Sequence, residues 1–181
     1  MFIGIKELER HPLRFREEFA PGTIDFRTGD FRQAGPLRVD LTAELEGAHI
    51  HIAGRLVVRL EFTCARCMEL VVQEMAPHFE LLYRPVSTIG RDEQIGLGGE
   101  KLEIGFYVRD GVFLADVVAE QVHLALPMKV VCREECRGLC PGCGANRNRE
   151  KCRCGPRAVD PRLAPLARIR AGLEDDEKKD P

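Results

Sequence analysis

The sequence predicts an α+β protein: an antiparallel β-meander or partly closed barrel, one or two helices, and a cysteine-rich C-terminal lobe. Residues 37–83 alternate apolar and polar side chains through most of their length, which is the period of half-buried strands. Residues 114–126 change to helical spacing. Six of the eight cysteines fall between Cys132 and Cys154, a density that indicates a small metal-stabilised unit.

The strands follow from the alternation. Gly47-Ala48 is a turn signal between the first two, and the Cys64–Cys67 segment forms a hairpin tip before the last. The last segment is either one strand or a bent pair. The predicted strands are 37–46, 49–53, 55–62 and 69–83.

Residues 86–99 are glycine-rich and predict a loop, and residues 101–108 predict another strand. Pro127 ends the helix at 114–126, and Asp160-Pro161 starts a short terminal helix that ends at Gly172. These boundaries predict three parts. They are a mainly antiparallel β domain at 1–128, a cysteine-rich basic lobe at 129–172 and a disordered acidic tail at 173–181.

The chain of 181 residues is 44% hydrophobic, which suffices for a modest core. Its first 28 residues contain no uninterrupted apolar run, and no stretch has membrane-spanning length. We therefore expect a cytoplasmic protein without a membrane partner. In a reducing compartment, clustered cysteines are more often metal ligands than disulfides.

The net charge of −2 conceals an uneven distribution. Residues 1–128 hold 14 Lys/Arg and 20 Asp/Glu, whereas residues 129–170 hold 11 Lys/Arg and 4 Asp/Glu. A basic lobe on an acidic body favours a polyanionic partner. Zinc held by four thiolates carries a net charge of −2, so such a site would reduce the excess of positive charge.

Four cysteines form the best-defined candidate metal site. Cys140-Pro-Gly-Cys143 has the spacing at which two thiolates reach one ion from a tight turn, and Cys152-Arg-Cys154 adds two more after enough chain to loop back. Four thiolates close a tetrahedral zinc site and leave no open position for a substrate. The sequence thus predicts a structural zinc-binding lobe.

The other four cysteines leave three alternatives. Cys64-x-x-Cys67 and Cys132-x3-Cys136 could complete a second tetrahedron, or they could be spare cysteines beside a single site. A redox pair at Cys64 and Cys67 is less well supported, because no predicted helix follows Cys67. The cofactor prediction is therefore one or two structural zinc ions.

Catalytic alternatives find little support. Cys136-x3-Cys140-x2-Cys143 has the spacing of radical enzymes that cleave S-adenosylmethionine, but only 38 residues follow Cys143, too few for their barrel. The sequence contains no GxSxG, P-loop or HExxH motif. We therefore expect no catalytic residues, no enzymatic activity and no small-molecule substrate.

Several motifs together resemble one family. They are Cys64-Ala-Arg-Cys67, Leu124-Ala-Leu-Pro127, Gly138-Leu-Cys-Pro-Gly-Cys-Gly144 and Asp160-Pro-Arg-Leu163, with Cys132, Asn146 and Asn148 between them. In order and spacing over residues 37–170 the chain is similar to the YceD family of large ribosomal RNA subunit accumulation proteins. The resemblance implies a bacterial or plastid protein that supports accumulation of this RNA through ribosome assembly.

The resemblance also implies a pairing of the cysteines. Some members of the family lack the Gly138-to-Cys154 cysteine cluster but retain the Cys-x-x-Cys and a cysteine- or histidine-bearing segment after the Leu-Pro. On that basis Cys64 and Cys67 belong with Cys132 and Cys136, and Cys140, Cys143, Cys152 and Cys154 form a second, optional site.

The function expected from these features is non-catalytic binding of large-subunit ribosomal RNA or its precursor particle. The basic side chains around the cysteines are the candidate RNA contacts: Arg133, Arg137, Arg147, Arg149, Lys151, Arg153 and Arg157. The first alternative is an adaptor that binds a ribosomal protein or assembly factor through an edge strand or the helix at 114–126. The second is a thiol oxidoreductase using Cys64 and Cys67.

Overall fold

The computed structural model describes residues 1–88, 103–108, 110–155, 161–163 and 166. Its contacts divide the chain into two compact units, Met1–Cys136 and Arg137–Pro181. We call these the sheet unit and the cysteine-rich unit. The arginine- and cysteine-rich segment expected from residue 129 onward is thus shared between the two, and Cys132 and Cys136 belong to the sheet unit.

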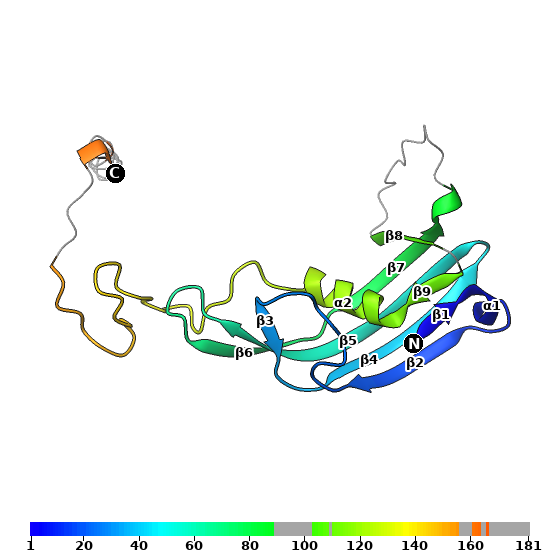
Figure 1. Cartoon of the computed structure of the whole chain (residues 1–181), viewed down its shortest axis with the longest axis horizontal. Coiled ribbons are helices and arrows are strands. Elements are labelled where there is room, and N and C mark those ends of the chain that lie inside the picture. Colours follow the sequence, from blue (N-terminus) through cyan, green and yellow to red (C-terminus); the bar gives the residue numbers. More distant parts are fainter. Residues whose placement is uncertain (89–102, 109, 156–160, 164–165, 167–181) are drawn as a thin grey trace, which may run out of the picture. The chain divides into compact units, whose positions relative to one another are not determined.

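β-Strands are the predominant regular secondary structure of the sheet unit (Figure 1). The cysteine-rich unit contains one short 3-10 helix among its described residues, η2 (Pro161–Leu163). The elements of the sheet unit are β1 (Phe2–Gly4), α1 (Ile5–Leu8), β2 (Leu13–Phe19), β3 (Phe31–Gln33), β4 (Leu37–Glu46), β5 (His49–Thr63), β6 (Leu70–Met75), β7 (His78–Pro85), η1 (Val86–Thr88), β8 (Glu103–Tyr107), β9 (Gly111–Phe113) and α2 (Leu114–Leu124).

The strands form an open sheet in the order β2-β4-β5-β7-β8. Strands β3 and β6 pair with the C-terminal half of β5, and β1 and β9 form a separate antiparallel pair. The sheet does not close, so the open meander rather than a barrel is observed. The pairing of β7 with β8 is parallel, which corrects the expectation of a purely antiparallel arrangement. Parallel neighbours need a crossover connection, and the separation in sequence between Pro85, where β7 ends, and Glu103, where β8 begins, is long enough to allow one.

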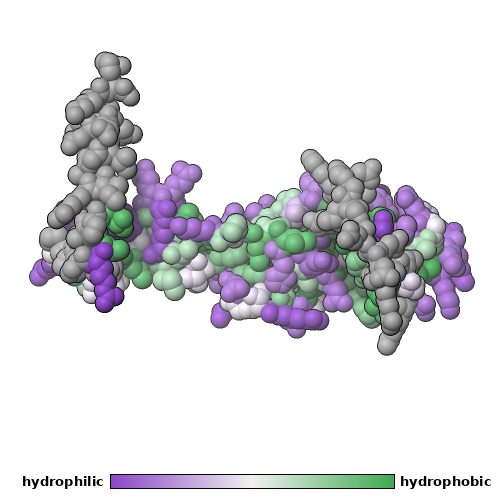
Figure 2. Space-filling model, turned by 90° about the horizontal axis from the view of Figure 1, so that it is seen from above, coloured by the Kyte–Doolittle hydropathy of each residue, from purple (hydrophilic) through white to green (hydrophobic). Residues whose placement is uncertain are grey.

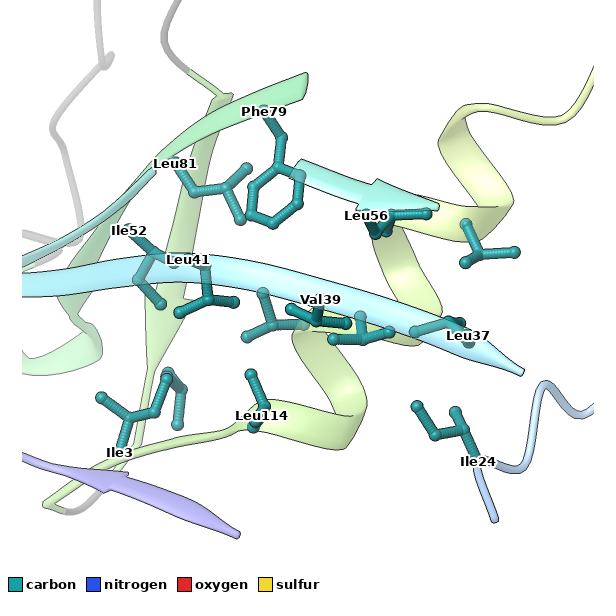
Figure 3. Close-up of a cluster of buried hydrophobic side chains, with 14 of the residues drawn as sticks. Ile3, Ile24, Leu37, Val39, Leu41, Ile52, Leu56, Phe79, Leu81 and Leu114 are labelled. Atoms are coloured by element: carbon teal, nitrogen blue, oxygen red, sulfur yellow. The ribbon is translucent and has the colours of Figure 1, made fainter. Parts of the chain in front are cut away.

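The alternation that predicted the strands places one face of the sheet in the core. Along β4 the side chains of Leu37, Val39 and Leu41 are buried, and along β5 the buried positions are even-numbered from Ile50 to Phe62. Helix α2 packs against this face, and Figure 3 shows Leu114 lying opposite the buried residues of β4. The helix expected at 114–126 thus exists and ends two residues earlier, at Leu124.

Gly54 lies inside one continuous strand, although the sequence predicted separate strands on either side of it. It is paired with Leu41 of β4, and the two backbones approach closely there. A Cβ atom added at Gly54 would lie 2.6 Å from the carbonyl oxygen of Asp40 and 2.7 Å from the Cα of Leu41. The glycine therefore permits a close strand contact and does not break the strand.

We expect Gly54→Ala to destabilise the protein by about 1–3 kcal/mol, because the atoms that clash belong to a backbone that must shift. Denaturant unfolding measures this change. Gly35→Ala is the matched control, since its added Cβ meets only the side chain of Arg59, at 3.9 Å. Equal stability of the two variants would contradict the close-approach explanation.

The sequence indicated little about residues 1–36, where the structure places β1, α1, β2 and β3. Most of the terminal helix expected after Asp160, the loop from residue 89 onward and the acidic tail lie outside the described residues. No helix among the residues described is long and apolar enough to cross a membrane. Figure 2 shows that hydrophobic side chains reach the surface among hydrophilic ones in several places.

Candidate metal centres

The first cysteine group joins two distant parts of the sheet unit. Cys64 and Cys67 lie on the turn between β5 and β6, and Cys132 and Cys136 lie on the segment that follows α2. Their four Sγ atoms lie within 4.8 Å of one another. The Sγ atoms of Cys64 and Cys136 are 3.9 Å apart, and those of Cys67 and Cys132 are 3.6 Å apart.

These distances fit a shared metal ion better than disulfides. With Zn–S bonds of about 2.3 Å, neighbouring sulfurs of a tetrahedron are about 3.8 Å apart. A disulfide would require about 2.05 Å, and none of the eight cysteines forms a disulfide. The group could therefore hold one metal ion, and the resemblance to the family had implied the same pairing.

Hydrogen bonds from main-chain amides and from one arginine hold the segment that carries Cys132 and Cys136 against the turn that carries Cys64 and Cys67. The amide of Ala65 donates to the carbonyl of Val130 at 2.9 Å, and the amide of Cys132 donates to Sγ of Cys64 at 3.3 Å. The guanidinium of Arg66 donates to the carbonyl oxygens of Glu134 (2.9 Å) and Cys136 (3.1 Å).

Sequence reasoning did not identify this role of Arg66. Its acceptors are backbone carbonyls, which leave no recognisable pattern in side-chain identity. Arg66 thus positions the segment that carries Cys132 and Cys136.

The second group lies entirely in the cysteine-rich unit. The Sγ atoms of Cys140, Cys143, Cys152 and Cys154 also lie within 4.8 Å of one another. The amide of Gly142 donates to Sγ of Cys140 at 3.4 Å, as expected in a tight metal-binding turn. The structure thus brings together all eight cysteines that the sequence singled out, as two groups of four.

The two groups differ in exposure. Cys64, Cys67 and Cys136 are buried, and Cys132 is half-buried. In the second group Cys143 and Cys154 are exposed. A metal in the second group would accordingly be more accessible to chelators and oxidants than a metal in the first.

Both C-x-x-C turns end in a residue with left-handed backbone. Gly144 follows Cys143 with φ of 74°, and Met68 follows Cys67 with φ of 62°. In each turn the amide of this residue donates to the carbonyl of the first cysteine, at 2.8 Å for Gly144 and 3.0 Å for Met68. The glycine signalled this geometry in the sequence, whereas a methionine rarely adopts it and gave no signal.

Main-chain amide groups favour the thiolate form of one cysteine in each group. Burial of Cys64 opposes ionisation, but the amides of Arg66, Cys67 and Cys132 outweigh it and lower the pKa of Cys64 to about 6. The amides of Gly142 and Cys143 lower the pKa of Cys140 to about 6. Each group thus holds a sulfur that is ionised at neutral pH, which is the form a cation requires.

Most of the predicted RNA-contacting side chains are exposed around the second group. Arg133 lies in the sheet unit and Arg157 lies outside the described residues; the exposed side chains of the cysteine-rich unit are Arg137, Arg147, Arg149, Lys151 and Arg153. Three of them, Arg137, Arg147 and Lys151, line a concavity of about 460 Å³ together with Glu150 and Cys152. Within the described part of the chain, the side chains of these three residues form no ion pair.

Asn146 and Asn148 organise the loop that carries these basic residues. Oδ1 of Asn148 accepts a hydrogen bond from the amide of Arg137 at 2.9 Å, and Oδ1 of Asn146 accepts one from the amide of Asn148 at 2.9 Å. Both asparagines are therefore used, at least through these oxygens, in shaping the loop.

Fold and sites together define a class of protein. It has an open sheet whose unit contains one four-cysteine group (Cys64, Cys67, Cys132 and Cys136), followed by an arginine-rich unit with a second four-cysteine group. A family model described as large ribosomal RNA subunit accumulation protein YceD matches residues 52–170. The chain belongs to the YceD family.

Curated relatives extend the similarity. A chloroplastic protein of Arabidopsis thaliana, named large ribosomal RNA subunit accumulation protein YCED homolog 1, is 24% identical over 170 residues, which cover 82% of this chain and 53% of the relative. The chain thus spans about half the length of that relative. An uncharacterized protein of Mycobacterium tuberculosis is 30% identical over 176 residues, covering 93% of this chain and 81% of its own length. No solved structure matches the chain significantly.

Proposed function

We propose that this protein is a non-catalytic zinc-binding factor that supports accumulation of large-subunit ribosomal RNA by binding that RNA or its precursor particle. The family description and the name of the Arabidopsis relative support the biological role. The proposed site of action is where ribosomes are assembled, the cytoplasm in a bacterium, while the plant relatives are named as chloroplastic.

The donor chemistry supports zinc as the metal. Each group offers four thiol sulfurs and no oxygen ligand among its four members, a set that suits zinc or iron–sulfur chemistry rather than magnesium or calcium. The sulfur spacings of 3.6 and 3.9 Å in the first group fit a single tetrahedral ion. When bound, zinc would supply a rigid cross-link between segments of chain.

A non-catalytic role agrees with these donor sets. Four cysteines fill a tetrahedral shell, which leaves no position for an activated water or a substrate. The thiol oxidoreductase alternative requires an accessible nucleophile, and Cys64, the lower-pKa member of its pair, has an exposed fraction of 0%.

The observation that carries the RNA proposal is the basic concavity of the cysteine-rich unit. Arg137, Arg147 and Lys151 converge there and form no ion pair among the described residues, although Glu150 lines the same concavity. Guanidinium and ammonium groups held in this way are suited to phosphate oxygens. The metal-binding loop would fix their positions and reduce the entropy lost on binding.

Crosslinking in cells followed by sequencing of the attached RNA tests the proposal directly. We expect enrichment of large-subunit ribosomal RNA, and we expect binding to an RNA fragment in vitro to weaken steeply as salt rises, because phosphate contacts release counterions. Crosslinks confined to protein, or binding that does not depend on salt, would instead support the adaptor alternative.

A further inference from the structure

A second candidate binding surface lies on the sheet unit, on elements other than the β5–β6 turn that carries Cys64 and Cys67. It is a pocket of about 570 Å³ formed by residues of β1, β7, β8, β9 and α2 (Figure 1). Five of the eleven aromatic residues of the chain line it, including both tyrosines: Phe2, Tyr83, Phe106, Tyr107 and Phe113.

The aromatic side chains at this pocket are partly open to solvent. Phe113 is 58% exposed, and Phe2 and Phe106 are each 41% exposed. The rings of Phe2 and Phe113 pack against each other with centroids 5.0 Å apart, which holds both at the pocket wall. Exposed aromatic groups gathered at a concave surface are typical of interaction sites.

Among the described residues, the charged side chains that line the pocket are all acidic. Asp110 precedes β9, and Asp116 and Glu120 lie four residues apart on α2, which places them on one helix face. Glu120 accepts a hydrogen bond from the hydroxyl of Tyr83 at 3.2 Å. Among the described residues, Asp116 pairs with the exposed Arg27 at 4.0 Å, which is too distant and solvated to neutralise the rim.

We propose that this pocket binds a basic peptide segment of a partner protein, with an apolar side chain seated among the aromatic rings and flanking lysines or arginines at the carboxylates. The aromatic faces attract cations in addition to burying apolar surface. Three carboxylates around an apolar floor complement such a segment in charge.

The same charges argue against a nucleic acid in this pocket. Asp110, Asp116 and Glu120 would repel phosphate oxygens, and no lysine or arginine among the described residues lines the pocket. The basic concavity and the acidic pocket therefore suit ligands of opposite charge. The inference goes beyond the proposed RNA function and does not depend on it.

Fluorescence anisotropy with a synthetic peptide tests this inference on the full-length, metal-loaded protein, tagged at its C-terminus to leave Phe2 undisturbed. The probe carries one phenylalanine between lysine and arginine residues. We expect it to bind at least tenfold more tightly than a peptide with serine in place of phenylalanine. A peptide with glutamate in place of every cation should not bind detectably.

Two variants of the protein should each weaken the probe about tenfold: Phe113→Ser, and the isosteric pair Asp116→Asn/Glu120→Gln. The pair should also flatten the salt dependence of binding. The matched control is Glu44→Gln/Glu46→Gln, which removes two exposed carboxylates on β4, outside the pocket.

Unchanged binding in both pocket variants, or an equal loss in the control, would overturn the inference by showing that the probe binds elsewhere. A labelled ribosomal RNA fragment distinguishes the two surfaces. Its binding should be unaffected by the pocket variants, and a loss there would mean that RNA, not peptide, occupies the pocket.

Discussion

Replacing Cys64 and Cys67 by serine is expected to remove one of two bound metal equivalents and to lower the unfolding midpoint of the sheet unit by more than about 10 °C. The group connects the β5–β6 turn to the segment after α2, so a metal there closes a long loop within one folded unit. Structural zinc contributes directly to folding free energy, and about 3 kcal/mol or more at this site corresponds to a shift of that size.

The matched variant is Cys140→Ser/Cys143→Ser. It should also lose one metal equivalent, but it should leave the unfolding midpoint of the sheet unit within about 2 °C. The second group lies wholly in the cysteine-rich unit, and none of the strand pairs depends on it. Elemental analysis and scanning calorimetry give the two readouts.

Loss of both metal equivalents in either variant would contradict two independent centres. Wild-type protein stripped by a chelator should reproduce both effects together, which separates metal loss from any effect of the serines themselves. Iron in place of zinc would correct the proposed metal and leave the two-centre arrangement intact.

Substitution of Arg137, Arg147 and Lys151 by alanine is expected to weaken binding of a large-subunit ribosomal RNA fragment by about a hundredfold at moderate salt. Each phosphate contact with single-stranded RNA contributes about 0.7 to the steepness of log affinity against log salt. If each of the three side chains makes one such contact, the variant should lose about 2 of that slope. Filter binding or anisotropy over a range of salt concentrations measures both values.

The control for this variant removes the same charge from the sheet unit. Arg14, Arg16 and Arg38 are exposed but lie in ion pairs with Asp40 and Glu18. Alanine at these three positions should change RNA affinity less than threefold, because paired cations release fewer counterions. An equal loss of RNA affinity in the two triple variants would mean that the affinity depends only on net charge, which would contradict a defined RNA site.

Periodicity predicted the strands well where one face of a strand is buried. The pattern of residues 37–46 was enough to define β4, because burial alternates with every residue in a strand. The same reasoning predicted two strands separated at Gly54, because glycine weakens strands on average. The close approach of Leu41 explains why a glycine lies inside β5. The parallel strand β8 was missed as such, since pairing direction has no local signature.

The two cysteine groups also differ in how far apart their members lie in the sequence, and this decided which group could be predicted. The spacing of Cys140, Cys143, Cys152 and Cys154 predicted their grouping, because four ligands within a short loop have few ways to reach one ion. Cys64 and Cys132 are 68 residues apart, and spacing alone left their grouping open. Family resemblance implied it, and the folded chain places their sulfurs together.

The sequence by itself determined β4, most of β5, the helix at α2 and the second cysteine group, since each depends on side chains that are neighbours along the chain. Only the tertiary structure showed that the sulfurs of the four cysteines in the sheet unit lie together, that Arg66 positions one of their segments, and that an aromatic pocket with an acidic rim is formed. These features combine residues from distant positions, such as Phe2, Tyr83 and Glu120. Their proximity depends on which strands pair and which face α2 covers, and neither is recorded in any short stretch of sequence.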